Sequence, residues 1–491
     1  MPLPDTPLPF GTPAQLDFLS RLSDGFDEVT RRFLAYVFMR TERRLWKRIL
    51  DPGDYELDRI RLPRSWIDRH FRGADSQGLF REKILDKERY NQESGTPYGF
   101  RPYDTRLLDL FVEAGRVRVS SGVPRFVNLY TGGVYRGRVK SRLRTESDGK
   151  LPPLVHSAIR AVGPGRFDAA AIESHLDQLR ENACGSGLYD RQRARLRHLN
   201  DERCYRALFL QGATRESGDV WSYMPAYAAQ STGRVGQRGG GLQNASRAMK
   251  EAAYSRIPGV RNYDLKSSQP RILVVLLDEA GIPSRWLRDY ATNPYAKERS
   301  AAAVGVPVDT WKKCINALLM GAQLRSPSQV RHTRGNALVR AVTQAASGQD
   351  AFREAYGRLY AHVSEVADDL ARWHDYLVGP YLDVHGRQNN RDGKVYVKNR
   401  VGAQFVASGP GISRRLHGLK SKLAAHLLQG REAAFTHTVA AAAETSGFSV
   451  LSHEHDGLVV QGKVPESVVE EAARVADLPL TLVDFVEKSL V

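Results

Sequence analysis

The chain has 491 residues, and 42% of them are apolar, which is enough to bury a core and excludes a largely disordered protein. Lys and Arg number 72 against 55 Asp and Glu, which gives a formal net charge of +17. This excess favours binding to polyanions such as nucleic acids, although an Arg-rich proteome would explain it equally well.

The three cysteines, Cys184, Cys204 and Cys314, lack CxxC spacing and are too few for a disulfide framework. The first residues show no signal peptide, and the longest aliphatic run, Ile272–Leu277, is too short to span a bilayer. We therefore expect a cytoplasmic protein with no membrane partner, and this expectation is compatible with a phage or plasmid origin.

The first 155 residues alternate helical patterns with Gly and Pro, which predicts an N-terminal accessory domain of unknown role. Its basic end, Arg136–Arg144, has two open interpretations, a solvated linker or a nucleic-acid contact. A helical, charge-rich pattern runs from Phe167 to Leu210, and a glycine-rich loop is predicted from Gln230 to Leu242.

Three later segments have clear local signals. The pattern of Asn262–Leu265 predicts a short strand that runs through Asp264 into a helix. A second helix is predicted over 309–320, with one apolar and one polar face. Two apolar runs within Phe448–Val460 predict a β-hairpin with Asp456 at its tip.

Asp264 and Asp456 are the candidate catalytic residues, one at a strand end and the other at a hairpin tip. Two converging carboxylates can hold two divalent cations about 3.5–4 Å apart, and Mg²⁺ prefers carboxylate oxygens. The pair alone proves little, because an Asp at a strand end is more often a turn former. A zinc site built on His453 and His455 is an alternative, although no fourth ligand is evident.

Four motifs in the order of the family-A DNA polymerases decide between these alternatives. Thr232–Arg234 followed by Leu242–Asn244 resembles the family's Thr-Gly-Arg and Leu-Gln-Asn at the same interval. Asp264–Leu273 resembles motif A, Asp-Tyr-Ser-Gln-Ile-Glu-Leu-Arg, in its Asp and in the Arg seven residues later. Leu428–Gly430, expected to open a helix, resembles the family's Gln-Gly, and His455–Val459 resembles motif C, His-Asp-Glu-Leu-Val. The resemblance covers about the C-terminal half of the chain.

The resemblance implies that Asp264 and Asp456 bind two Mg²⁺ ions, which Mn²⁺ can replace, with the backbone carbonyl of Leu265 as a further ligand. It assigns primer–template contacts to a set of polar residues around this site: Thr232, Arg234, Gln243, Asn244, Arg271, Gln429 and His455. It assigns nucleotide binding to a second set: Lys312, Lys313, Asn316, Gln269 and Arg299, with Lys297 as an alternative to Arg299.

The sequence departs from the family in two places that bear on sugar selection. The motif-A glutamate that excludes a ribose 2′-hydroxyl is Gln269, and the bulky tyrosine of the finger helix becomes Met320 or Gly321. The acidic residue after the motif-C aspartate is Gly457. We expect weak discrimination against ribonucleotides, because an amide can donate a hydrogen bond to the 2′-hydroxyl.

The implied fold is α+β, a right-hand polymerase with an antiparallel palm, helical fingers and a helical thumb. Its expected parts are an accessory domain over 1–155, a thumb over 156–230, a palm over 231–285 and 401–491, and fingers over 286–400.

The implied function is primer extension by a monomeric DNA polymerase that uses dNTPs. No proofreading exonuclease is expected, because Asp54–Glu56 has no partner motif. A single-subunit RNA polymerase or primase-polymerase, acting on RNA or NTPs, is one alternative. A non-catalytic nucleic-acid-binding descendant is the other.

Overall fold

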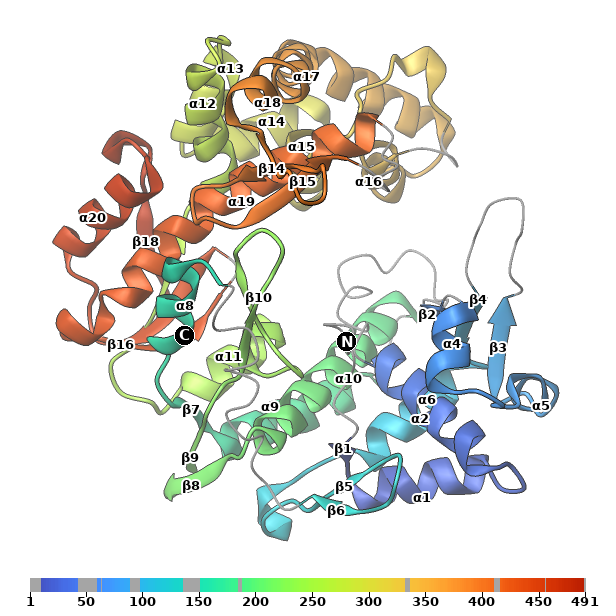
Figure 1. Cartoon of the computed structure of the whole chain (residues 1–491). Coiled ribbons are helices and arrows are strands. Elements are labelled where there is room, and N and C mark those ends of the chain that lie inside the picture. The colour runs from blue at the N-terminus through green and yellow to red at the C-terminus, as the bar shows by residue number, and fades with distance from the viewer. Residues whose placement is uncertain are drawn as a thin grey trace.

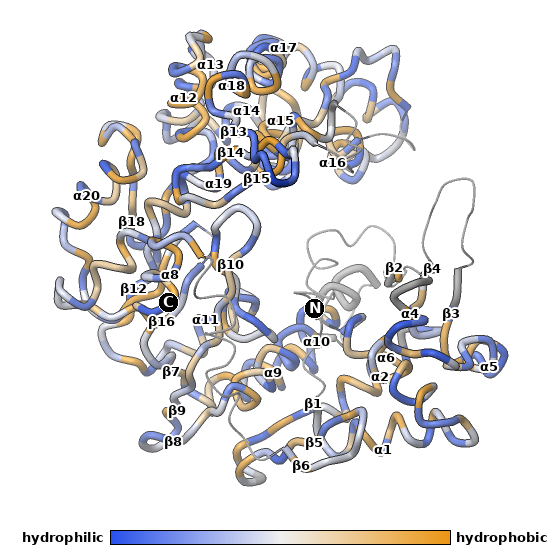
Figure 2. Tube along the Cα trace, viewed as in Figure 1, coloured by the Kyte–Doolittle hydropathy of each residue, from blue (hydrophilic) through white to orange (hydrophobic). Residues whose placement is uncertain are grey.

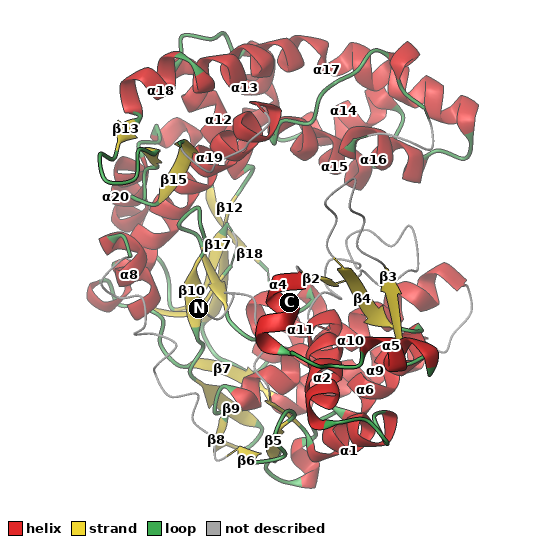
Figure 3. Cartoon of the chain, turned by 45° about the vertical axis from the view of Figure 1, so that its right-hand side comes forward, coloured by secondary structure: helices red, strands yellow, loops and turns green. Residues whose placement is uncertain are grey.

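The computed structural model describes residues 10–42, 60–62, 64–88, 98–135, 151–183, 188–331, 336–409, 416–454 and 456–489. It mixes helices with small antiparallel sheets (Figure 1). A helical lobe at the top and a lobe with the N-terminal helices are joined by a region that holds a four-stranded sheet (Figure 3). Arg136–Arg144, Asp54–Glu56, Cys184 and His455 lie outside the described residues. Within the ranges given, no helix is long and apolar enough to cross a membrane.

The N-terminal part builds its own core from short elements. Helix α1 begins with a capping box, in which the Thr12 hydroxyl accepts from the Gln15 amide and the Gln15 side chain accepts in return. The elements are β1 (Phe10–Gly11), α1 (Pro13–Leu22), α2 (Glu28–Glu42), β2 (Ile60–Leu62), α4 (Arg64–His70), α5 (Ser76–Arg81), β3 (Leu85–Glu88), β4 (Tyr98–Pro102), α6 (Thr105–Ala114), β5 (Phe126–Asn128) and β6 (Val134–Tyr135). They form two three-stranded sheets, β1-β5-β6 and β2-β4-β3, with the helices packed around them.

The long helix α10 (Leu188–Leu210) links this part to the rest of the chain. Its residues Leu196 and Leu199 belong to the N-terminal core, whereas Tyr205 and Leu208 belong to the next core along the chain. That second core also takes residues from β7 (Gly165–Asp168), α9 (Ala169–Ala183), β9 (Val220–Tyr223) and α11 (Arg247–Tyr254). The two cores therefore share one helix.

The segment predicted as a glycine-rich loop is in part a hairpin. Strands β10 (Tyr227–Ala229) and β11 (Val235–Gln237) pair antiparallel, and the turn between them contains Gly233 at a φ of 87°. The prediction of a loop was wrong here, because the glycines signal the turn but not the short strands on either side. Beyond β11, Gly239, Gly240 and Gly241 all have positive φ and lead into the turn Leu242–Asn244.

The four-stranded sheet has the order β16-β17-β12-β18, and all its pairs are antiparallel. Its strands are β12 (Val260–Leu265), β16 (Ser449–His453), β17 (Gly457–Gln461) and β18 (Phe485–Lys488). The predicted strand at Asn262–Leu265 is confirmed as the end of β12, and the predicted hairpin is confirmed as β16–β17. The C-terminal strand β18, which the sequence analysis did not anticipate, covers the other edge of β12.

The helical lobe and its neighbours share the largest core with this sheet. The elements are α8 (Pro153–Arg160), α12 (Ser268–Glu279), α13 (Arg285–Thr292), α14 (Ala296–Val304), α15 (Val308–Leu319), α16 (Ala337–Ala345), α17 (Gln349–Val378), α18 (Pro380–His385), α19 (Leu416–Ala441) and α20 (Glu466–Ala476). A small sheet, β13 (Arg387–Gln388), β14 (Val395–Lys398) and β15 (Gln404–Ser408), lies beside α19. Figure 2 shows hydrophobic and hydrophilic residues along most of these helices, as expected for amphipathic helices packed on a core.

Candidate active site

The sheet brings Asp264 and Asp456 together. Asp264, near the end of β12, lies directly opposite Gly457 in β17. Asp456 comes one residue before Gly457 in the chain, so it lies next to the position opposite Asp264. The amide of Leu265 donates to the carbonyl of Asp456 at 3.0 Å, which extends the pairing past the aspartates. The two carboxyl groups are close enough for Asp264 to raise the pKa of Asp456. Two residues 192 positions apart in sequence thus share one end of a rigid sheet.

Gly457 is required for this arrangement. A Cβ atom at this position would lie under 3.0 Å from the carbonyl oxygen of Tyr263 and 3.1 Å from the Cα of Asp264. Both obstacles are backbone atoms of the neighbouring strand, so they cannot turn aside as a side chain would. The absence of an acidic residue after Asp456 therefore has a steric cause, because β12 and β17 pass too close for any side chain.

A third carboxylate, which the sequence analysis missed, lies beside the pair. Glu432 is fully buried in α19, accepts a hydrogen bond from the Ser268 hydroxyl at 3.0 Å, and forms an ion pair with Arg234. Burial raises the pKa of Glu432, and Arg234 opposes that rise. An acidic residue within the apolar run of a helix was the one available signal in the sequence, because no motif marks it.

The electrostatics of the site are those of crowded negative charge. Burial, followed by the charges of Asp264 and Glu432, raises the pKa of Asp456 to about 7, while Lys488 lowers it. Lys488, at the end of β18, forms an ion pair with Asp264. Carboxylates this close cannot all stay ionised without a cation nearby. The site therefore has the charge and the ligand type to hold a hard divalent cation.

Three of the predicted primer–template residues, Arg234, Gln243 and Arg271, have side chains that bond inside the protein. Gln243 is buried, accepts from the Gln237 amide at 2.5 Å and donates to the Val235 carbonyl at 3.2 Å. The guanidinium of Arg271 donates to the Ala291 carbonyl and to Asp484, each at 3.1 Å. The guanidinium of Arg234 pairs with Glu432, so all three side chains have partners within the chain.

The other predicted primer–template residues that the structure describes are Thr232, Asn244 and Gln429. Thr232 lies in the β10–β11 turn, where its carbonyl accepts from Asn399 at 2.8 Å. Asn244 is half-buried, and its carbonyl accepts from Asn200 at 3.1 Å. Gln429 is half-buried in the middle of the 26-residue helix α19, so the prediction that it opens a helix was wrong.

In the alternative zinc site, His453 would be a ligand, but its ring nitrogen bonds inside the protein. His453 is buried at the end of β16, and its Nε2 lies 3.1 Å from the carbonyl of Ala158, to which it donates. Burial lowers the pKa of His453 to about 4, so the ring is neutral. Among the residues that the structure describes, no group of three or more His, Cys, Asp or Glu side chains is arranged to hold a metal ion.

The predicted faces of helix α15 are confirmed. Its apolar side, Trp311, Cys314, Ile315, Leu318 and Leu319, is buried. Lys312, Lys313 and Asn316 are exposed on the other side. Because a helix turns by about 100° per residue, the two lysines are adjacent but not equivalent.

Four lysines from separate elements form a lysine cluster: Lys266, Lys297, Lys312 and Lys488. Lys297 in α14 is half-buried, and burial, followed by the charges of Lys312, Lys266 and Lys488, lowers its pKa. Since Lys488 also pairs with Asp264, this cluster borders the aspartates. Lys312 acts on Lys297 from the exposed face of α15, where it also pairs with Asp309 at 3.4 Å. Arg299 pairs with Asp289 at 3.2 Å on the surface.

Comparisons with known proteins identify no family for the chain. No family model matches it, and no curated protein is significantly similar to it in sequence. Among solved structures, it is similar to the POL domain of Pol1 from M. smegmatis in complex with DNA primer-template and dNTP, with a TM-score of 0.43 and 12% identity. The match covers 88% of this chain and 76% of that one. This likeness is distant, and the function proposed below rests on the site residues.

Proposed function

We propose that this chain is a template-directed nucleotidyltransferase, a primer-extending DNA polymerase of the family-A type. The observation that carries the proposal is the pair Asp264 and Asp456, held side by side by two paired strands and bordered by a lysine cluster. Carboxylates that hold cations, facing lysines that hold phosphates, are the parts that nucleotidyl transfer needs. The motif order from Thr232 to Val459 supports the same function.

In this proposal the four-stranded sheet, with 231–285 and 401–491, is the palm, and the helices within 286–400 are the fingers. The helices within 156–230 act as the thumb, and 1–155 as an accessory domain. Asp264 and Asp456, with the Leu265 carbonyl, would hold Mg²⁺, which would activate the primer 3′-oxygen and neutralise the leaving pyrophosphate. Glu432 positions the first turn of α12 through Ser268, and Arg234 balances its charge.

A primer-extension assay tests the proposal. Purified protein would be incubated with Mg²⁺ and a 5′-labelled primer on DNA or RNA template, with dNTPs and NTPs in separate lanes. Extension with dNTPs on DNA supports the proposal, and ribonucleotide products should also be visible because Gln269 replaces the excluding carboxylate. Products only with NTPs, or without a primer, favour the RNA polymerase or primase alternative. Duplex binding without any product favours the non-catalytic descendant.

The two lysines of α15 should differ in their effect. Lys312→Ala should raise the nucleotide KM and lower kcat, because Lys312 acts on Lys297 within the lysine cluster and would meet the leaving pyrophosphate. Lys313→Ala is the matched control on the next position of the same exposed face, and should stay within about twofold of wild type. Steady-state single-nucleotide insertion measures both. Equal losses of kcat/KM in the two variants would contradict the different roles expected for Lys312 and Lys313.

Stability should depend on pH through Asp456. A carboxyl whose pKa is higher in the folded than in the unfolded chain stabilises the fold at acid pH and loses that contribution as pH rises through the folded pKa. For Asp456 that pKa is about 7. In EDTA, Tm should therefore fall between about pH 6 and about pH 8, and Mg²⁺ should restore it more at the higher pH.

Asp456→Asn is the matched variant for this effect, because an amide mimics the protonated carboxyl at every pH. Its Tm should fall less over the same interval, and Mg²⁺ should raise it less. Thermal melts followed by circular dichroism measure both quantities. A Mg²⁺-induced rise that is the same at both pH values in wild type would contradict the assignment.

A further inference from the structure

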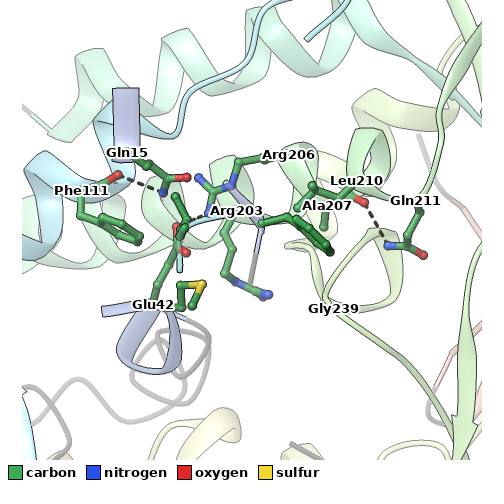
Figure 4. Close-up of a pocket in the computed structure, with 12 residues that line it drawn as sticks. Gln15, Glu42, Phe111, Arg203, Arg206, Ala207, Leu210, Gln211 and Gly239 are labelled. Carbon is green, nitrogen blue, oxygen red and sulfur yellow. Dashed lines mark hydrogen bonds and ion pairs between the residues drawn. The ribbon is translucent and has the colours of Figure 1, made fainter. Parts of the chain in front are cut away.

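A small cavity lies at the joint between the N-terminal part and the rest of the chain, away from the residues assigned above. Its volume is about 50 Å³, and its lining comes from α1, α2, α6, α10 and the segment at Gly239 (Figure 4). One water needs about 10–15 Å³ measured in this way. The cavity therefore has room for several waters or for one small polyatomic ion.

Most polar groups in the lining already have partners. Arg206 donates to Glu42 at 2.5 Å and to the carbonyl of Gly115 at 3.1 Å. The side chain of Gln15 bonds the backbone of Thr12 and Phe111. Gln211 donates to two carbonyls and accepts from the Ala226 amide. Glu42, the carboxylate among the described lining residues, is thus neutralised by Arg206.

Arg203 is the exception. Only 5% of it is exposed, and its Nη2 donates to the Asn200 side chain at 3.1 Å and lies 3.4 Å from the Cys204 sulfur. Its Nε is buried without a hydrogen-bond partner. Within the described part of the chain, its Nη1 has no bonded acceptor and no carboxylate pairs with it. A buried guanidinium without a counter-charge is costly, and such a group in a folded protein points to a missing ion or water.

The backbone next to Arg203 is shaped to leave this space. Gly240 has a φ of 106°, and a Cβ there would lie 2.7 Å from the Arg203 Nη1. A side chain at this position would therefore fill the space beside the free donor. Among the lining residues that the structure describes, Arg203 is a cation without a carboxylate partner, and its Nε and Nη1 have no bonded acceptor.

We propose that this cavity binds a small phosphate-class oxyanion through Arg203. Charge-assisted hydrogen bonds from the guanidinium would satisfy its unused donors, of which Nε is buried, and the ion would tie α10 to the segment Gly239–Gly241. The shared ligand chemistry has two sources, free orthophosphate or the terminal phosphate of a nucleic-acid strand. The inference does not rest on the proposed function, because it concerns Arg203 alone.

Thermal unfolding of the full chain tests the proposal. Sodium phosphate would be titrated against sodium chloride at constant ionic strength in a buffer that has no other oxyanion. Wild-type Tm should rise by at least about 2 °C and saturate, because the ligand binds only the folded state. Arg203→Met should show no rise, and should be at least as stable as wild type without phosphate, because it removes an unpaired buried charge.

Two further variants make the result decisive. Arg197→Met, on the same helix but outside the cavity, is the matched control and should keep the full phosphate response. Arg203→Lys keeps the charge with fewer donors, so it should keep a smaller response, and it stands in if Arg203→Met fails to fold. A phosphate response that survives in both Arg203 variants at full size, an equal response to chloride, or no response in wild type would overturn the proposal and leave a water-filled cavity.

Fluorescence anisotropy then separates the two sources of phosphate. Oligonucleotides with and without a 5′-phosphate would be compared on wild type and Arg203→Met. A wild-type preference of at least about fivefold for the phosphorylated strand, absent in the variant, assigns the site to a strand end. Equal binding of the two strands, together with the Tm response above, assigns it to free orthophosphate.

Discussion

Asp264→Asn and Asp456→Asn should each slow primer extension by at least about a thousandfold, while duplex affinity stays within a few-fold of wild type. The reason is the geometry of the sheet, which leaves these two carboxylates as the shared ligands for cations at one point. An amide keeps the shape and loses the charge, so the fold should tolerate the change. Single-turnover extension measures the rate, and anisotropy measures binding.

Asp278→Asn is the matched control for these variants. Asp278 lies in α12, close in sequence to Asp264, but its carboxylate pairs with Arg288 at 2.5 Å on the surface. Its loss should leave extension unchanged, because exposed ion pairs contribute little. Extension by either active-site variant within tenfold of wild type would be incompatible with a two-cation mechanism at this site.

Gly457→Ala should cost nearly as much activity as the loss of an aspartate, and should also lower stability. The added methyl group meets the Tyr263 carbonyl and the Asp264 backbone, so β12 and β17 must separate where the carboxylates meet. Overpacking of this kind costs about 1–3 kcal/mol. A displacement of about 1 Å at a catalytic group lowers the rate by about a hundredfold. Denaturant unfolding and single-turnover extension measure the two effects.

Gly357→Ala is the control for the glycine substitution. Gly357 lies inside α17, and nothing lies within 4 Å of the position of its added Cβ. That variant should gain about 0.5–1 kcal/mol, because alanine is the better helix former, and should keep full activity. If Gly457→Ala behaves like Gly357→Ala, the close approach of the two strands is not what aligns the carboxylates.

Local patterns in the sequence predicted the elements that carry the aspartates. Two apolar runs broken by a polar segment predicted the β16–β17 hairpin, and the helical period predicted which face of α15 is buried. Both signals arise from neighbouring residues, because they express the periodicity of strand and helix. The same reasoning predicted that Asp264 ends a strand, and strand order then placed it opposite Gly457.

Contacts between distant segments were not predictable in this way. The pairing of Arg234 with Glu432 joins residues 198 positions apart, and nothing local marks either as the partner of the other. The motif resemblance assigned Arg234, Gln243 and Arg271 to a duplex, and it did not predict the bonds that their side chains make inside the protein. A polar residue has the same letter in a sequence whether its side chain is buried or exposed. Only the packing around it decides which of the two it is.

Because both cores share helix α10, the chain should tolerate a break in its backbone but not the removal of its N-terminal part. Removal of residues 1–135 would expose Leu196 and Leu199 to water and leave Arg206 without Glu42, so a shortened chain should aggregate. A break in the backbone after residue 135 would leave those contacts intact. Two separately expressed pieces should therefore reassemble into one particle. The protein suits split-fragment complementation, with α10 as the surface on which the smaller piece folds.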